Sequence, residues 1–169
     1  MKIATLGSRI IDDAVVSSKA GNHNDNIKRI VGISLFSINS DSLFNENERW
    51  NIKEKNSYRK NILTMDLNKS IMQILAKTRY ERLFIDFADS AGDIWQCTLT
   101  DGRIFRCTYN DIFRNNITYI KESIIAKSKC STKNEVIIKP LEWNDAELTA
   151  EVTRLASELL ALDVSRTVL

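Results

Sequence analysis

The chain begins with Lys2-Ile3-Ala4-Thr5-Leu6-Gly7-Ser8-Arg9, a largely apolar run that ends in a Gly-Ser pair. The apolar run predicts a strand, and Gly7 allows the chain to turn sharply after it. Ser8 is a favoured N-cap residue for the next helix, which we expect over about 9–18. Because ligands of α/β proteins bind outside the carboxyl ends of the strands, Gly7 and Ser8 mark the first candidate site.

Strand and helix signals alternate along the rest of the chain. The nearly continuous apolar run over 82–87 predicts a central strand that is buried on both faces. Other expected elements are a strand around 28–33, an amphipathic helix over 58–77, a hairpin over 94–108, a helix over 109–127 and a short apolar segment at 136–138. The order predicts a three-layer α/β fold with a mainly parallel sheet and a small antiparallel hairpin, built as a single domain over 1–169.

The last helix has the clearest signals. Asn144 is a typical N-cap, and Glu147 three residues later completes a capping-box pattern. An apolar stripe predicts one buried face, formed by Leu148, Val152, Leu155, Leu159 and Leu162. After this helix, residues 166–169 look like the start of a strand. The polar segment over 39–57 predicts a long surface loop or a lid.

Composition points to an ordinary globular protein. The 169 residues are 43% hydrophobic and 27% charged, and the net charge of +2 gives no electrostatic reason to expect nucleic acid as a partner. We interpret the basic stretch Lys53, Lys55, Arg59 and Lys60 as solvated surface. No apolar window approaches the length of a membrane span, and no signal peptide is evident, so we expect a cytoplasmic protein.

Three cysteines are present, and we expect free thiols. A two-residue turn at Asp101-Gly102 would place Cys97 opposite Arg106, and Cys107 opposite Gln96. The two sulfurs would then lie on opposite faces of the hairpin, which excludes a disulfide between them. Buried free thiols are the simplest interpretation.

Two groups of residues are candidates for chemistry. Ser8 is a possible nucleophile if a base lies within reach, and the only histidine is His23; the alternative role of Ser8 is the helix N-cap. Asp86, Asp89 and Asp93 follow the buried strand and could orient a base, bind a hydroxyl or hold a metal, or else act as turn residues. Motifs for dinucleotides, for phosphate loops and for zinc are lacking, so we expect no cofactor.

Short motifs along most of the chain carry a family resemblance. They are Gly7-Ser8-Arg9-Ile10-Ile11-Asp12-Asp13, Ser34-Leu35-Phe36-Ser37, Met65-Asp66-Leu67-Asn68-Lys69, Leu83-Phe84-Ile85-Asp86-Phe87-Ala88-Asp89, Asp101-Gly102-Arg103-Ile104 and Pro140-Leu141. Together they resemble the SGNH-hydrolase-like domains encoded in bacterial capsule and surface-polysaccharide gene clusters. The resemblance implies ester hydrolysis or acyl transfer onto a sugar, with a glycan or acyl donor as partner.

The site that the resemblance implies has Ser8 as its remaining candidate nucleophile in this chain, because Arg9 occupies the position that aligns with the nucleophile of related enzymes. Its binding residues would be Gly7, Arg9, Ser34, Asp86 and Asp89. Arg9 stands where the family usually has Cys, and a guanidinium binds carboxylate or phosphate rather than attacking an ester.

The family also implies a His-bearing strand beyond the last helix, which leads us to expect a truncated member or a fragment. The alternative function is a non-catalytic module that binds a glycan, an acyl carrier or a protein.

Overall fold

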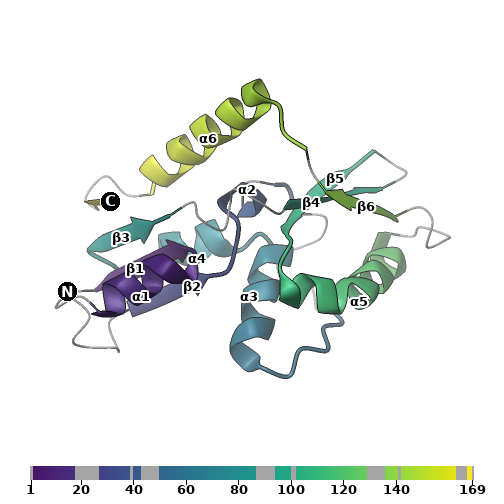
Figure 1. Ribbon diagram of the computed structural model, residues 1–169, viewed down its shortest axis with the longest axis horizontal. Helices are drawn as coiled ribbons and strands as arrows, with labels where there is room; N and C mark the ends of the chain where they lie inside the picture. The colour runs from purple at the N-terminus through teal and green to yellow at the C-terminus, as the bar shows by residue number, and fades with distance from the viewer. Residues whose placement is uncertain are drawn as a thin grey trace.

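Two β-sheets, each with its own hydrophobic cluster, form the fold (Figure 1). The computed structural model describes residues 2–17, 27–38, 40–42, 50–86, 94–99, 102–128, 136–140, 142–162 and 167–168. The mixed α/β class expected from the sequence is confirmed. The hairpin, however, belongs to a separate sheet and is not an addition to the parallel one. The three-layer arrangement and the single domain stay predictions.

The first sheet is parallel and has the order β2-β1-β3-β7. Its strands are β1 (Ile3–Gly7), β2 (Ile27–Val31), β3 (Arg82–Ile85) and β7 (Thr167–Val168). The pairing of β7 with β3 confirms the strand expected at the end of the chain. The chain leaves β1 toward β2 and later returns to the other side of β1 as β3. This reversal creates a topological switch point at the carboxyl ends of β1 and β3.

Strand β1 is buried along its whole length because both of its faces are covered. On one face, Thr5 donates a hydrogen bond to Asp12 of α1 (Arg9–Ser17), with 3.3 Å between Oγ1 and Oδ1. On the other face, Ala4 and Leu6 join the larger hydrophobic cluster. Strand β3 is less buried than the sequence predicts, and only Leu83 is fully buried, because β7 pairs with just two of its residues.

Short helices supply the rest of the larger cluster. They are α2 (Leu35–Ile38), α3 (Ser57–Leu67), α4 (Ile71–Lys77) and α6 (Asp145–Leu160). The single helix expected over 58–77 is wrong, since the chain breaks between α3 and α4. The break lies at Lys69, whose φ of +53° is left-handed and cannot continue an α-helix.

The second sheet is antiparallel and has the order β5-β4-β6. Its strands are β4 (Ile94–Leu99), β5 (Ile104–Thr108) and β6 (Val136–Pro140). Helix α5 (Asp111–Ser128) supplies Phe113, Ile120 and Ile124 to the cluster that contains Phe105 of β5. Pro140 ends an edge strand, where a missing N–H is tolerated.

The hairpin register differs by one residue from the expected one. Cys97 pairs with Phe105, and Cys107 pairs with Trp95. The Leu99 N–H donates to the Arg103 carbonyl, so three residues rather than two connect the strands. Because a slip of one residue moves a side chain to the other face, both thiols share one face and one hydrophobic cluster. Both are free and buried, as expected, but the argument from opposite faces was wrong.

Helix α6 has the predicted capping box, in which Asn144 and Glu147 bond to each other's backbone. The predicted buried stripe is wrong in its first two turns, where Leu148 and Val152 are each 38% exposed. Glu151 is buried there instead, because it pairs with Arg106 of β5 and with Arg154.

The end of the expected surface loop over 39–57 is packed into the protein. Trp50 and Ile52 are both 7% exposed and belong to the second cluster. The Trp50 indole N–H donates to Asn68 Oδ1 over 2.6 Å. The described residues at this end are therefore anchored to the α3–α4 turn and not free to act as a lid.

Candidate functional site

A carboxylate clamp joins the carboxyl ends of β1 and β3. Asp86 accepts hydrogen bonds from the Ser8 backbone N–H (3.2 Å) and from the Ser8 hydroxyl (2.7 Å). Ser8 Oγ also accepts the Ile10 N–H at 3.1 Å, which confirms Ser8 as the N-cap of α1. Ser8 is only 1% exposed, and its hydroxyl donates its hydrogen bond to the Asp86 carboxylate. The clamp thus accounts for the polar atoms of Ser8 without any catalytic role.

Gly7 makes this clamp possible. Its φ is +131°, and a Cβ at this position would lie 2.4 Å from the Asp86 carbonyl oxygen. Such a contact is far inside van der Waals distance, so only glycine fits at the end of β1. The close approach of the two strand ends follows directly from this residue.

The structure brings together only some of the residues expected in the site. Gly7, Ser8 and Asp86 meet at the switch point, and Arg9 is exposed at the start of α1. Ser34 is fully buried, and its N–H donates to Thr108 of β5 over 2.8 Å. Ser34 therefore serves the contact with the second sheet. Asp89, Asp93 and His23 lie outside the described residues.

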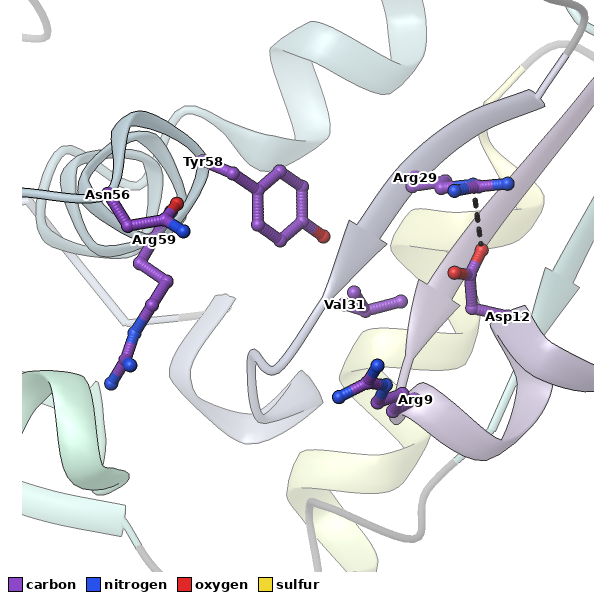
Figure 2. Close-up of a pocket in the computed structure, with 7 residues that line it drawn as sticks. All are labelled: Arg9, Asp12, Arg29, Val31, Asn56, Tyr58 and Arg59. Atoms are coloured by element: carbon purple, nitrogen blue, oxygen red, sulfur yellow. Dashed lines mark hydrogen bonds and ion pairs between the residues drawn. The ribbon is translucent and has the colours of Figure 1, made fainter. Parts of the chain in front are cut away.

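Next to the clamp, α1, β2 and the start of α3 enclose a cleft of about 450 Å³. Its lining residues, drawn in Figure 2, are Arg9, Asp12, Arg29, Val31, Asn56, Tyr58 and Arg59. Figure 2 shows the Tyr58 ring extending from α3 toward β2, and the Arg9 side chain reaching toward the same space from α1. The lining residues are up to fifty positions apart in the sequence, so no local sequence motif predicts the cleft.

Arginine dominates the charge of this cleft. Arg29 pairs with Asp12 (Nε to Oδ1, 3.3 Å), and Arg59 pairs with Glu54 (Nε to Oε2, 3.5 Å). Within the described ranges, Arg9 has neither an ion pair nor a hydrogen bond. Among the described residues, Arg9 is thus the arginine of the cleft whose side chain has no carboxylate partner.

Tyr58 forms an aromatic wall of the cleft. It lines the cleft beside Val31 of β2 and stays 45% exposed. Burial is the main cause that raises the pKa of Tyr58, and the Asp12 charge adds to it; the Val31 backbone, Arg29 and Arg9 act in the opposite direction. The side chain is therefore a neutral phenol at physiological pH, with its ring available to a ligand.

A second polar cluster, formed by Ser37, Asp66 and Lys69, is structural. Lys69 Nζ lies 2.8 Å from Ser37 Oγ and 3.1 Å from Asp66 Oδ1, and it also donates to the Arg106 carbonyl. Asp66 accepts the Ser37 hydroxyl and, over 2.8 Å, the Thr108 N–H. A serine beside a lysine is a known catalytic pairing, but this lysine donates to a carboxylate and the serine is fully buried.

A smaller groove of about 270 Å³ lies between α6 and β5. Arg106 and Arg154 line it, and both pair with Glu151, at 3.5 and 2.5 Å. Arg106 also stacks on Trp143, 4.7 Å from the ring centroid. These cations are already engaged, so the cleft beside Arg9 is the better anion site.

Of the seven residues that line the cleft, the sequence predicts only Arg9 as a site residue. The six that it does not predict are Asp12, Arg29, Val31, Asn56, Tyr58 and Arg59. Arg59 belongs to the basic stretch that we interpret as solvated surface. Among the described residues, no group of His, Cys, Asp and Glu side chains could hold a metal ion. In the same part of the chain, no helix has the length and hydropathy needed to cross a membrane. Comparison with protein-family models, with curated proteins and with solved structures finds no match to this chain.

Proposed function

We propose that the protein is a binding domain that takes an anionic ligand in the cleft beside Arg9. The observation that carries this proposal is the convergence of Arg9, Arg29 and Arg59 on one cavity that contains fewer carboxylates than guanidinium groups. A rigid guanidinium fork matches the oxygens of carboxylates and phosphates. A cavity of this size is within the usual range for small-molecule sites.

The start of α3 adds to this preference for anions. The Arg59 N–H is capped by Asn56 Oδ1 over 3.1 Å, and the Asn56 N–H donates to Glu54. The N–H groups of Ser57 and Tyr58, by contrast, have no intrahelical acceptor because they belong to the first turn. The positive end of the helix dipole therefore faces the same cleft.

The resemblance to SGNH-hydrolase-like domains supports a carbohydrate ligand, of the kind handled in surface-polysaccharide biosynthesis. It also keeps ester hydrolysis or acyl transfer as a second candidate, since Ser8 lies at the switch point where such enzymes place their nucleophile. The binding function is favoured because the Ser8 hydroxyl is held by Asp86 and by the Ile10 N–H.

The hydrolytic candidate is tested with acetyl esters. We expect wild type and Ser8→Ala to hydrolyse them at the same background rate. A rate that falls in Ser8→Ala, with the fold retained by circular dichroism, would instead support catalysis at Ser8.

Anion binding is tested by titrating inorganic phosphate into the protein at low ionic strength and following the arginine side-chain resonances by NMR. We expect saturable shifts at Arg9, and a loss of affinity of about tenfold or more in Arg9→Gln, because one charge-assisted contact contributes on this scale. The matched control is Arg114→Gln, an exposed arginine on α5 paired with Asp111. The proposal fails if phosphate does not bind, or if the two variants lose affinity equally.

A further inference from the structure

We infer that the ligand is a phosphorylated sugar, with its phosphoryl group at Arg9 and its ring against Tyr58. This inference rests on the proposed function and names the class of anion that the cleft selects. Two features carry it: the donors that α1 and the start of α3 contribute to one cleft, and the aromatic face of Tyr58 beside them.

The donors suit a phosphoryl group better than a carboxylate. Arg9 approaches from α1, while the terminal nitrogens of Arg59 and the amide of Asn56 belong to the start of α3. In the described part of the chain, the Asn56 amide nitrogen has no protein acceptor. A phosphate monoester offers three oxygens in a tetrahedral arrangement and a charge near −2, so it can accept from both walls at once. A carboxylate has two oxygens in one plane and a single charge.

The Tyr58 ring supplies a platform at the side of these donors. Its backbone lies in the first turn of α3, and its side chain lines the cleft and extends toward β2 (Figure 2). A tyrosine side chain has only two rotatable side-chain torsions, so little conformational entropy is lost when a ligand packs against it. The C–H face of a sugar ring can pack on such an aromatic surface and remove apolar area from water.

Polar groups around the ring fit the remaining sugar hydroxyls. Asp12 Oδ1 is engaged by Arg29 and Thr5, and Asp12 lines the cleft on the side opposite α3. Carboxylate oxygens accept several hydrogen bonds, so Asp12 can receive a sugar hydroxyl in addition. The cleft of about 450 Å³ is large enough for one sugar ring and its phosphate.

Binding constants for glucose 1-phosphate, inorganic phosphate and glucuronate test this inference by calorimetry. In wild type we expect glucose 1-phosphate to bind about tenfold more tightly than inorganic phosphate, and more tightly than glucuronate. Tyr58→Leu should remove the advantage of the sugar phosphate over phosphate. Tyr58→Phe, which keeps the ring, should restore most of it.

The outcomes separate this inference from the proposed function. If phosphate binds and requires Arg9 but the sugar adds nothing, the proposed function stands and the phosphosugar ligand is refuted. If glucuronate binds as tightly as glucose 1-phosphate, or if Tyr58→Leu keeps the sugar advantage, the inference is again overturned. If neither phosphate nor glucose 1-phosphate binds, both fail together.

Discussion

Replacing Lys69 by Met tests whether the buried Ser37–Asp66–Lys69 cluster holds the two sheets together. The Lys69 side chain is 5% exposed and that of Asp66 is 3% exposed. Its ammonium donates to Ser37 after β2, to Asp66 in α3 and to the Arg106 carbonyl in β5. Met keeps the apolar stem and removes the ammonium, and with it these hydrogen bonds and the contact of Nζ with the Phe105 ring, 4.6 Å from its centroid.

The magnitude follows from what remains after the substitution. Asp66 would keep its bonds from Ser37 and from Thr108 but would lose the one cation that pairs with it among the described residues. Leaving one buried ion unpaired costs about 3–5 kcal/mol. This is a large part of the roughly 5–15 kcal/mol that stabilises a typical domain. With a typical urea dependence of about 2 kcal/mol per M, the midpoint of unfolding should fall by about 2 M.

Urea unfolding followed by circular dichroism measures this loss. Lys60→Met, at an exposed position on α3, is the matched control and should change stability by no more than about 0.5 kcal/mol. Lys69→Gly also removes the ammonium, but glycine adopts the left-handed φ without strain, which recovers about 1 kcal/mol. The cluster would not hold the fold as we argue if Lys69→Gly were as stable as wild type. The same would follow if Lys69→Met lowered the urea midpoint no more than Lys60→Met does.

Three further predictions concern stability. Gly7→Ala should reduce the soluble yield and the urea midpoint sharply, because its Cβ would lie 2.4 Å from the Asp86 carbonyl oxygen. The control Gly102→Ala has open space around its Cβ and should lose only the strain energy of its positive φ, about 1 kcal/mol. Burial raises the pKa of the Cys107 thiol well above its ordinary value of 9.0, so the unfolded chain loses this proton first. The free energy of unfolding should therefore be independent of this thiol below about pH 9 and fall above it by about 1.4 kcal/mol per pH unit. Urea unfolding of Cys107→Ala over the same pH range should lack the decrease that this thiol causes. Asn144→Ala should lose the capping box and about 1 kcal/mol, seen as a lower urea midpoint with α6 fraying at its start; an unchanged midpoint would contradict the role of the cap.

Features decided by neighbours in sequence were predictable. The apolar run of β1, the Gly7-Ser8 pair that ends it and the N-cap role of Ser8 can all be recognised within a few neighbouring residues. The same is true of the Asn144–Glu147 capping box.

Features decided by distant partners were not predictable. The apolar pattern over 58–77 continues through the break although its residues serve two clusters: Leu63 and Leu67 of α3 belong to the second cluster, and Ile71 and Leu75 of α4 belong to the larger one. The left-handed Lys69 is explained only by Ser37 and Arg106, which lie more than thirty positions away on either side. Glu151 interrupts the apolar stripe of α6 for a similar reason, since its partner Arg106 belongs to β5.

The candidate site shows the same division. Arg9 stood out in the sequence because it follows the first turn and replaces a residue suited to nucleophilic attack. Arg29 lies within a strand pattern, and Arg59 belongs to the basic stretch interpreted as solvated surface, so neither residue pointed to a site. Only the tertiary arrangement of α1, β2 and the start of α3 brings them to the cleft of Arg9.

The most direct test of this account is a crystal structure of the protein soaked with glucose 1-phosphate. The account predicts a phosphoryl group within hydrogen-bond distance of the Arg9 guanidinium, about 2.7–3.2 Å, with the sugar ring over Tyr58. A phosphoryl group bound in the groove between Arg106 and Arg154, with the cleft beside Arg9 left empty, would contradict it.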